Sequence, residues 1–68
     1  MYRYYVNKNA QPTGEHEVHT SLCGYKPLPE NSIYLGEYPS CQAAIIKARE
    51  YYEEVDGCYF CCRECHNR

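Results

Sequence analysis

The chain has 68 residues, enough for one domain spanning residues 1–68, and its hydrophobic content of 44% includes nine tyrosines but no tryptophan. A chain of this length buries roughly 60% of the surface of its unfolded form, so we expect a constraint beyond the hydrophobic core to stabilise it. The formal net charge is −2 and the Lys and Arg residues form no cluster, which argues against nucleic acid as a partner.

The first two predicted elements are the strands of an antiparallel β-hairpin. Residues 2–8 are rich in Tyr and Val, residues 9–14 supply turn residues, and residues 15–19 resume the alternation of apolar and polar side chains. Successive side chains of a strand point to opposite faces of a sheet. His16 and Val18 are therefore expected on one face of the hairpin, with Glu17 and His19 on the other.

A loop and a short third strand are predicted next. Gly24, Pro27, Pro29 and Asn31 interrupt regular structure, so residues 20–32 are expected to form a loop that passes through Cys23. The sequence Ile-Tyr-Leu-Gly-Glu-Tyr at residues 33–38 then predicts a short strand.

One helix is predicted over residues 41–54, with Ser40 as its N-cap and residues 56–57 as its stop signal. The apolar stripe that we expect to pack on the sheet includes Ala44, Ala48 and Val55. The predicted fold is therefore α+β. It comprises a three-stranded antiparallel sheet, made of a β-hairpin plus a short third strand, with one helix and a Cys-rich C-terminal knuckle.

The role expected of the six cysteines depends on whether the compartment is reducing or oxidising. Residues 1–8 lack the apolar run and the cleavage site of a secretory signal, and no segment holds the about eighteen consecutive apolar residues that span a membrane. We therefore expect a cytoplasmic protein that does not enter the membrane. In a reducing cytosol, clustered cysteines are metal ligands or redox thiols more often than disulfides.

Two short ligand pairs predict a zinc site. They are His19-x3-Cys23 and Cys58-x2-Cys61, which lie far apart in the chain. A tetrahedral structural zinc site needs four nitrogen or sulfur ligands, and two such pairs are the usual way to supply them. The expected role of the metal is to tie the hairpin to the C-terminal segment, because metal binding then contributes to folding.

Other uses of the cysteines remain open. The later group Cys62-x2-Cys65 with His66 repeats the ligand spacing and is an alternative zinc set. The thiols could also be buried as small apolar groups or paired in disulfides. Cys41 lies in the first turn of the predicted helix, where the helix dipole can lower a thiol pKa, although packing is the commoner role.

Several short motifs resemble the metal-binding domain of Ada-type DNA methylphosphotriester repair proteins, together with small bacterial and archaeal proteins of unassigned function. The similar stretch spans about two thirds of the chain, and its motifs are Val18-His19-Thr20-Ser21-Leu22-Cys23, Leu28-Pro29-Glu30-Asn31, Tyr34-Leu35, Ser40 with Ala44-Ile45, and Cys58-x2-Cys61. The resemblance implies a small zinc-binding fold. Zinc in that family is held by Cys-x3-Cys and Cys-x2-Cys, and the first cysteine accepts a methyl group from an alkylated phosphate.

This chain departs from the family at the residue that carries the repair chemistry. His19 stands in the position of the methyl-accepting cysteine and cannot act as a thiolate acceptor. Gly57 stands where the family usually has proline, and basic residues near the knuckle are sparse. The resemblance therefore implies a fold and a ligand set, without methyl-transfer repair.

The predicted function is a small zinc-stabilised binding or interaction module whose partner is an unidentified protein or small molecule. No segment presents a nucleophile, a base and an orienting group together, so we do not predict an enzyme. The first alternative is thiol redox chemistry or metal handling by the cysteines of residues 61–65. A further alternative, by analogy with the repair domain, is weak nucleic-acid binding.

Overall fold

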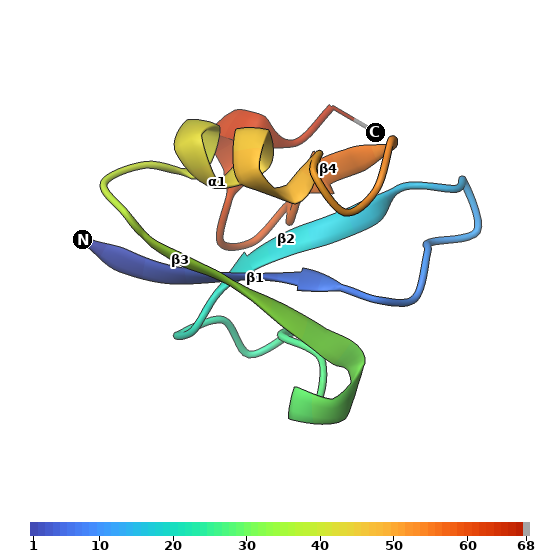
Figure 1. The fold of residues 1–68 in the computed structure, drawn as a ribbon, viewed down its shortest axis with the longest axis horizontal. Coiled ribbons are helices and arrows are strands. Elements are labelled where there is room, and N and C mark those ends of the chain that lie inside the picture. The colour runs from blue at the N-terminus through green and yellow to red at the C-terminus, as the bar shows by residue number, and fades with distance from the viewer. Residues whose placement is uncertain (68) are drawn as a thin grey trace.

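The computed structural model describes residues 1–67 and places one α-helix over a four-stranded mixed sheet (Figure 1). The elements are β1 (Tyr2–Asn7), β2 (His16–Thr20), β3 (Ser32–Tyr38), α1 (Cys41–Ala48) and β4 (Val55–Gly57), with short 3-10 turns at Pro29–Asn31 and Arg63–Cys65. The α+β class with a single helix is as predicted. None of the helices in this part of the chain is long and apolar enough to cross a membrane.

The predicted β-hairpin is confirmed, and the third strand joins it at the opposite edge of β1. β1 lies antiparallel to both β2 and β3, and Tyr5 pairs with His19 on one side and with Tyr34 on the other. Val18 is fully buried against the helix, while His16, two residues earlier, stacks on Tyr52 with ring centroids 3.6 Å apart. Alternation along β2 then turns His19 toward the face that α1 does not cover.

The helix begins as predicted but ends early. Ser40 occupies the N-cap position with an extended backbone, although its hydroxyl makes no capping hydrogen bond. The last helical residue is Ala48 rather than residue 54. Three of the next six residues, in the segment 49–54, are glutamates, and negative charge near a helix C-terminus opposes the helix dipole. The helix therefore stops at Ala48, and these residues form the turn back to the sheet.

The prediction of a purely antiparallel, three-stranded sheet is wrong because residues 55–57 form a fourth strand. β4 pairs in parallel with the outer edge of β2, which gives the strand order β3-β1-β2-β4. Val55 continues the apolar spacing of the predicted helix, but it packs on the same core from β4. Pairing with β2 satisfies backbone groups that an open sheet edge would leave exposed.

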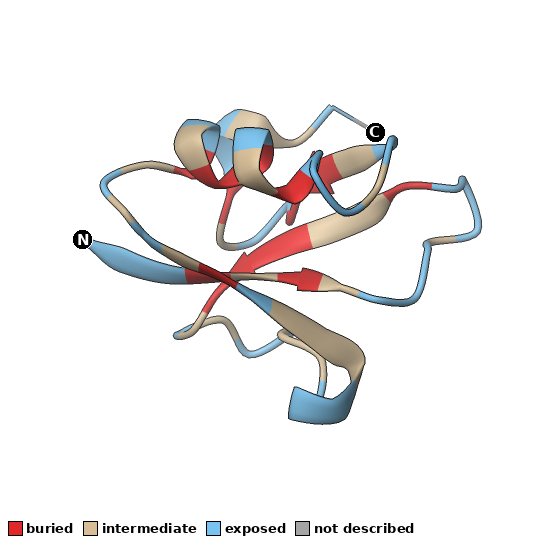
Figure 2. Cartoon of the chain, viewed as in Figure 1, coloured by how far each residue is buried: buried red, intermediate tan, exposed pale blue. Residues whose placement is uncertain are grey.

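The core lies between α1 and the sheet, where the buried residues gather in Figure 2. Ala44 and Ala48 have no exposed surface and allow the helix to approach the sheet closely, as predicted. The sheet contributes Tyr4, Val6 and Val18, each at most 4% exposed. Burial of this face is expected to supply most of the hydrophobic stabilisation of so small a domain.

A disulfide ties the start of the helix to the C-terminal segment. Cys41, the first residue of α1, is bonded to Cys65 in the second 3-10 turn, with their Cα atoms 6.4 Å apart. Cys41 is therefore neither simply packed nor a free thiol. The other four cysteines, Cys23, Cys58, Cys61 and Cys62, are free.

Candidate metal centre

The first ligand pair comes from the end of β2 and the turn that follows. His19 is only 1% exposed, although it lies on the face of β2 opposite the one that packs against α1. The backbone N–H of Cys23 donates to the carbonyl oxygen of Thr20 (3.2 Å), which closes a tight turn immediately after the strand. This turn brings the thiol of Cys23 back toward the imidazole, as the x3 spacing predicts.

The second pair reaches the same place because β4 runs parallel to β2. Val18 pairs with Gly57, so the next residues along the two strands, His19 and Cys58, lie side by side. The N–H of Cys58 extends the pairing by donating to the carbonyl of Val18 (2.9 Å). The Cys62 N–H then donates to the carbonyl of Cys58 (2.8 Å), which closes the knuckle.

Gly57 is required at the start of this knuckle by the close approach of the chain. A Cβ atom at Gly57 would lie 2.5 Å from the backbone oxygen of Cys62 and 2.7 Å from the Cβ of Cys65. Neither contact can be relieved by rotating a flexible side chain, because backbone and Cβ atoms are involved. Any larger residue would therefore push the knuckle away from β4.

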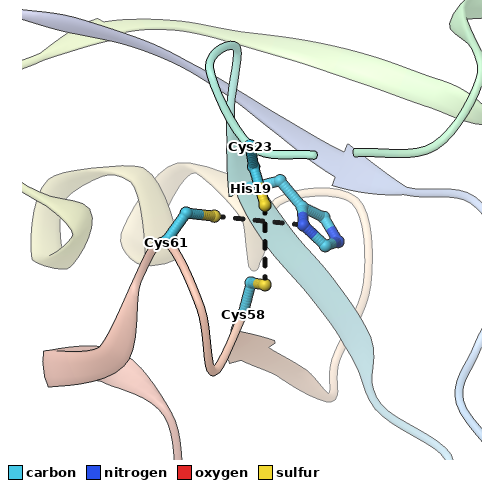
Figure 3. Close-up of side chains that lie close together, drawn as sticks. All are labelled: His19, Cys23, Cys58 and Cys61. Atoms are coloured by element: carbon cyan, nitrogen blue, oxygen red, sulfur yellow. Dashed lines mark hydrogen bonds between the residues drawn. The ribbon is translucent and has the colours of Figure 1, made fainter. Parts of the chain in front are cut away.

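The four predicted ligands converge on one point, as Figure 3 shows. One ligand atom from each of His19, Cys23, Cys58 and Cys61 lies within 4.8 Å of the other three. The Cys23 and Cys58 sulfurs are 3.9 Å apart, and the Cys61 sulfur is 4.0 Å from His19 Nδ1. These two contacts cross in Figure 3, as opposite edges of a tetrahedron do.

These separations suit a small tetrahedral cation. With zinc–sulfur bonds of about 2.3 Å and a zinc–nitrogen bond of about 2.1 Å, two sulfur ligands of a tetrahedron are about 3.8 Å apart, and a sulfur and a nitrogen ligand about 3.6 Å apart. The measured sulfur–sulfur contact of 3.9 Å and sulfur–nitrogen contact of 4.0 Å are slightly longer than these values. The donor set of three thiols and one imidazole is also one that structural zinc sites use. The cluster could therefore bind a metal ion of this size and preference.

Backbone N–H groups point at three of the sulfurs. Such contacts stabilise a thiolate, because an amide dipole aimed at a negative charge disperses it. The donors are the N–H of Tyr25 to Cys23 Sγ (3.4 Å), of Phe60 to Cys58 Sγ (3.4 Å), and of Thr20 to Cys61 Sγ (3.3 Å). The first two share an i to i+2 geometry, so both ligand loops fold in the same way around their cysteine.

The orientation of His19 is set by a carboxylate on its own strand. His19 Nε2 lies 3.5 Å from Glu17 Oε1, while Nδ1 faces the sulfur of Cys61. A carboxylate at Nε2 favours a proton on that nitrogen and leaves the Nδ1 lone pair for a metal. Burial raises the pKa of Glu17. Glu17 was not predicted as part of the site, although strand alternation places it on the same face as His19.

The ligand thiols are held in their protonated form when no cation is present. Burial raises the pKa of Cys23 and raises that of Cys58 to about 12. The hydrogen bond with Cys62 and burial raise the pKa of Cys61, while the same hydrogen bond lowers the pKa of Cys62. A metal ion at the centre would displace these protons, because the thiolate is the form that binds it.

The alternative ligand set is not brought together in residues 1–67. Cys65 is bonded to Cys41, and Cys62 lies in the hydrophobic core at 2% exposure. His66 Nδ1 instead lies 2.9 Å from the carbonyl oxygen of Gly57 and 3.2 Å from Asp56 Oδ2. These three residues therefore anchor the C-terminal segment rather than form a second centre.

No family model matches this chain, and no curated protein or solved structure shows significant similarity to it. The resemblance to Ada-type metal-binding domains accordingly stays a prediction from the motifs alone.

Proposed function

We propose that this protein is a small zinc-stabilised binding or interaction module. The observation that carries the proposal is the convergence of His19, Cys23, Cys58 and Cys61 from two distant segments, with their ligand atoms within 4.8 Å of one another. Zinc is the ion that prefers a tetrahedral set of three thiolates and one imidazole.

A structural role fits the site better than catalysis does. Catalytic zinc usually keeps one coordination position for water or substrate, whereas here protein side chains can fill all four. His19 and Cys58 are also at most 2% exposed, which leaves little access for a substrate. Because His19 replaces the thiolate acceptor of the Ada-type domains, methyl transfer is not part of the proposal.

The outer side of the two ligand loops supports a binding role. These loops expose large apolar side chains around a hollow of about 300 Å³ whose floor includes Cys23 and Cys61. Leu22 is 82% exposed, and Tyr25 and Phe60 are each 64% exposed. Tyr25 of the first loop stacks on Phe60 of the second with ring centroids 4.2 Å apart. A metal bound by both loops would therefore hold this apolar surface in one conformation, ready to bind a partner.

Thiol redox chemistry is the alternative, and one observation favours it. The chain already holds an oxidised pair, Cys41–Cys65, close in sequence to Cys61 and Cys62, whose sulfurs are 3.9 Å apart. A cytoplasmic location, which we propose with the zinc role, keeps ligand thiols reduced. The disulfide favours an oxidising compartment instead. Cys62 is 2% exposed, so its attack on an external substrate would require the knuckle to open.

Native mass spectrometry of protein purified without chelator tests the proposal. The expected mass corresponds to the chain with one zinc ion and one disulfide, and treatment with chelator at neutral pH should remove only the zinc. A metal-free protein with further disulfides would instead support the redox alternative. A folded, metal-free protein whose four free thiols stay reduced would contradict both proposals.

A further inference from the structure

A second site lies beside the candidate metal centre, where the helix begins. A partly enclosed pocket of about 320 Å³ opens between the ends of β1 and β2, the start of α1 and the C-terminal segment. Its volume is at the lower end of the range for small-molecule sites. Its lining residues are Tyr2, Tyr4, Thr20, Pro39, Ser40, Cys41, Cys61 and Glu64.

Two tyrosines line this pocket. The rings of Tyr2 and Tyr4 meet at 76°, with their centroids 6.5 Å apart. Tyr4 is 4% exposed and is fixed by the core, whereas Tyr2 is 52% exposed and forms part of the rim. The exposed ring of Tyr2 offers a ligand an electron-rich surface, which attracts a cation that comes within about 6 Å of the ring centroid.

The charge in and around the pocket is negative. Glu64 lines it, and no Lys, Arg or His of residues 1–67 does. The neighbouring guanidinium groups are engaged elsewhere, since Arg63 lies 4.6 Å from the ring centroid of Tyr59 and Arg3 bonds Glu37 at 3.3 Å. A zinc ion held by three thiolates and one imidazole would add a net charge of about −1 behind Cys61.

The start of α1 opposes the negative charge of Glu64, because a helix N-terminus carries about half a positive charge at most. The full charge of Glu64 exceeds that contribution, so the pocket favours cations over anions.

We propose that this pocket binds an alkylammonium group, either a quaternary ammonium head or a methylated amine. The ring of Tyr2 would contact its methyl groups, Tyr4 would close the inner wall, and Glu64 would balance its charge. The hydroxyls of Thr20 and Ser40 also line the pocket and can accept from a protonated amine. The inference rests on the proposed function, because it assigns a ligand to the binding module.

Titration of the ¹⁵N-labelled protein with choline, followed by NMR, tests this assignment. The matched probe is the uncharged tert-butyl isostere of choline, in which carbon replaces the nitrogen. Choline should cause saturable shifts of the amide signals around Tyr2, Thr20 and Glu64. The isostere should bind about tenfold more weakly, because it has the shape of choline without its charge.

Two exposed residues can be replaced without disturbing the core. Glu64→Gln should weaken choline binding about tenfold and Tyr2→Leu about threefold, through loss of the charge pair and of one ring. The matched controls are Glu53→Gln, an exposed glutamate outside the pocket, and Tyr34→Leu, which is 50% exposed against 52% for Tyr2. Both controls should bind choline as the parent protein does.

A peptide containing trimethyllysine distinguishes the two sources of the ligand. Binding at least as tight as that of choline identifies a protein side chain, and clearly weaker binding identifies a free small cation. Equal binding of choline and its isostere, or shifts confined to the Tyr5 and Tyr34 face, would overturn the proposal. Zinc measured in the same samples separates this outcome from failure of the proposed function, because a metal-free protein that still binds choline refutes only the zinc role.

Discussion

Replacement of Cys58 by alanine tests whether a bound metal or the hydrophobic core supplies most of the stability of the fold. Cys58 and Cys62 are each 2% exposed and belong to the same knuckle, but only Cys58 is in the ligand cluster. Structural zinc contributes about 10 to 16 kcal/mol of apparent binding free energy in small zinc-finger peptides. The core of a chain below about 70 residues rarely supplies more than 3 to 5 kcal/mol. Loss of the metal should therefore unfold at least the segment from β4 onward.

The matched variant Cys62→Ala removes a sulfur of equal burial from the core. Its expected cost is about 1 to 2 kcal/mol, the effect of a small cavity, with the zinc retained. The assay combines zinc content with thermal unfolding followed by circular dichroism, with and without chelator. Chelator should lower the melting temperature of the parent and of Cys62→Ala, but not that of Cys58→Ala. The reasoning fails if Cys58→Ala keeps its zinc and melts with the parent, or if Cys62→Ala loses as much zinc.

Three further predictions concern the partner of the histidine, the protons of the thiols and the helix face. Glu17→Gln should weaken zinc binding about 10 to 100-fold without unfolding the protein, because it removes the charge that orients His19. Competition with a zinc-responsive dye measures the affinity, and an unchanged affinity would refute this prediction. The pKa values of the three ligand thiols are raised, that of Cys58 to about 12, so these thiols are protonated near pH 7 before zinc binds. Zinc binding near pH 7 should therefore release about three protons. Affinity should therefore rise with pH, and calorimetry in two buffers of different ionisation enthalpy gives the count. Ala48→Asp, at a fully buried position, should cost about 3 kcal/mol or more, whereas Ile46→Asp, at a position 65% exposed, should leave the melting temperature nearly unchanged.

The hairpin and the start of the helix were predictable because their signals are local. Turn residues follow the first strand directly, and strand alternation placed His19 on the face opposite Val18. The ligand pairs were recognisable for the same reason, since each lies within one turn of chain. Their convergence was an inference from zinc chemistry alone, because Cys23 and Cys58 are 35 residues apart and no local pattern joins them.

The fourth strand was missed because its apolar residue continued the helical pattern. Tyr52 and Val55 fit the spacing of the helix, and both pack on the core, but from the turn and from β4. Helical spacing reports that a residue faces the core without saying which element carries it. The pairing of Cys41 with Cys65 was equally hidden, since cysteine spacing does not determine which cysteines bond to each other.

The parallel pairing of β4 with β2 also has a consequence for how the molecule is made. The ribosome delivers the hairpin first, so His19 and Cys23 are available while Cys58 and Cys61 are still to be synthesised. At about 5 to 20 residues per second, the nascent chain carries this half-site for about 2 to 8 s before its other half follows. If the proposed function is right, two ligands alone hold zinc too weakly to compete with other zinc-binding molecules in the cell. On that proposal the metal would be captured only after residue 61 emerges, and the zinc supply at that moment would set the fraction of new chains that fold.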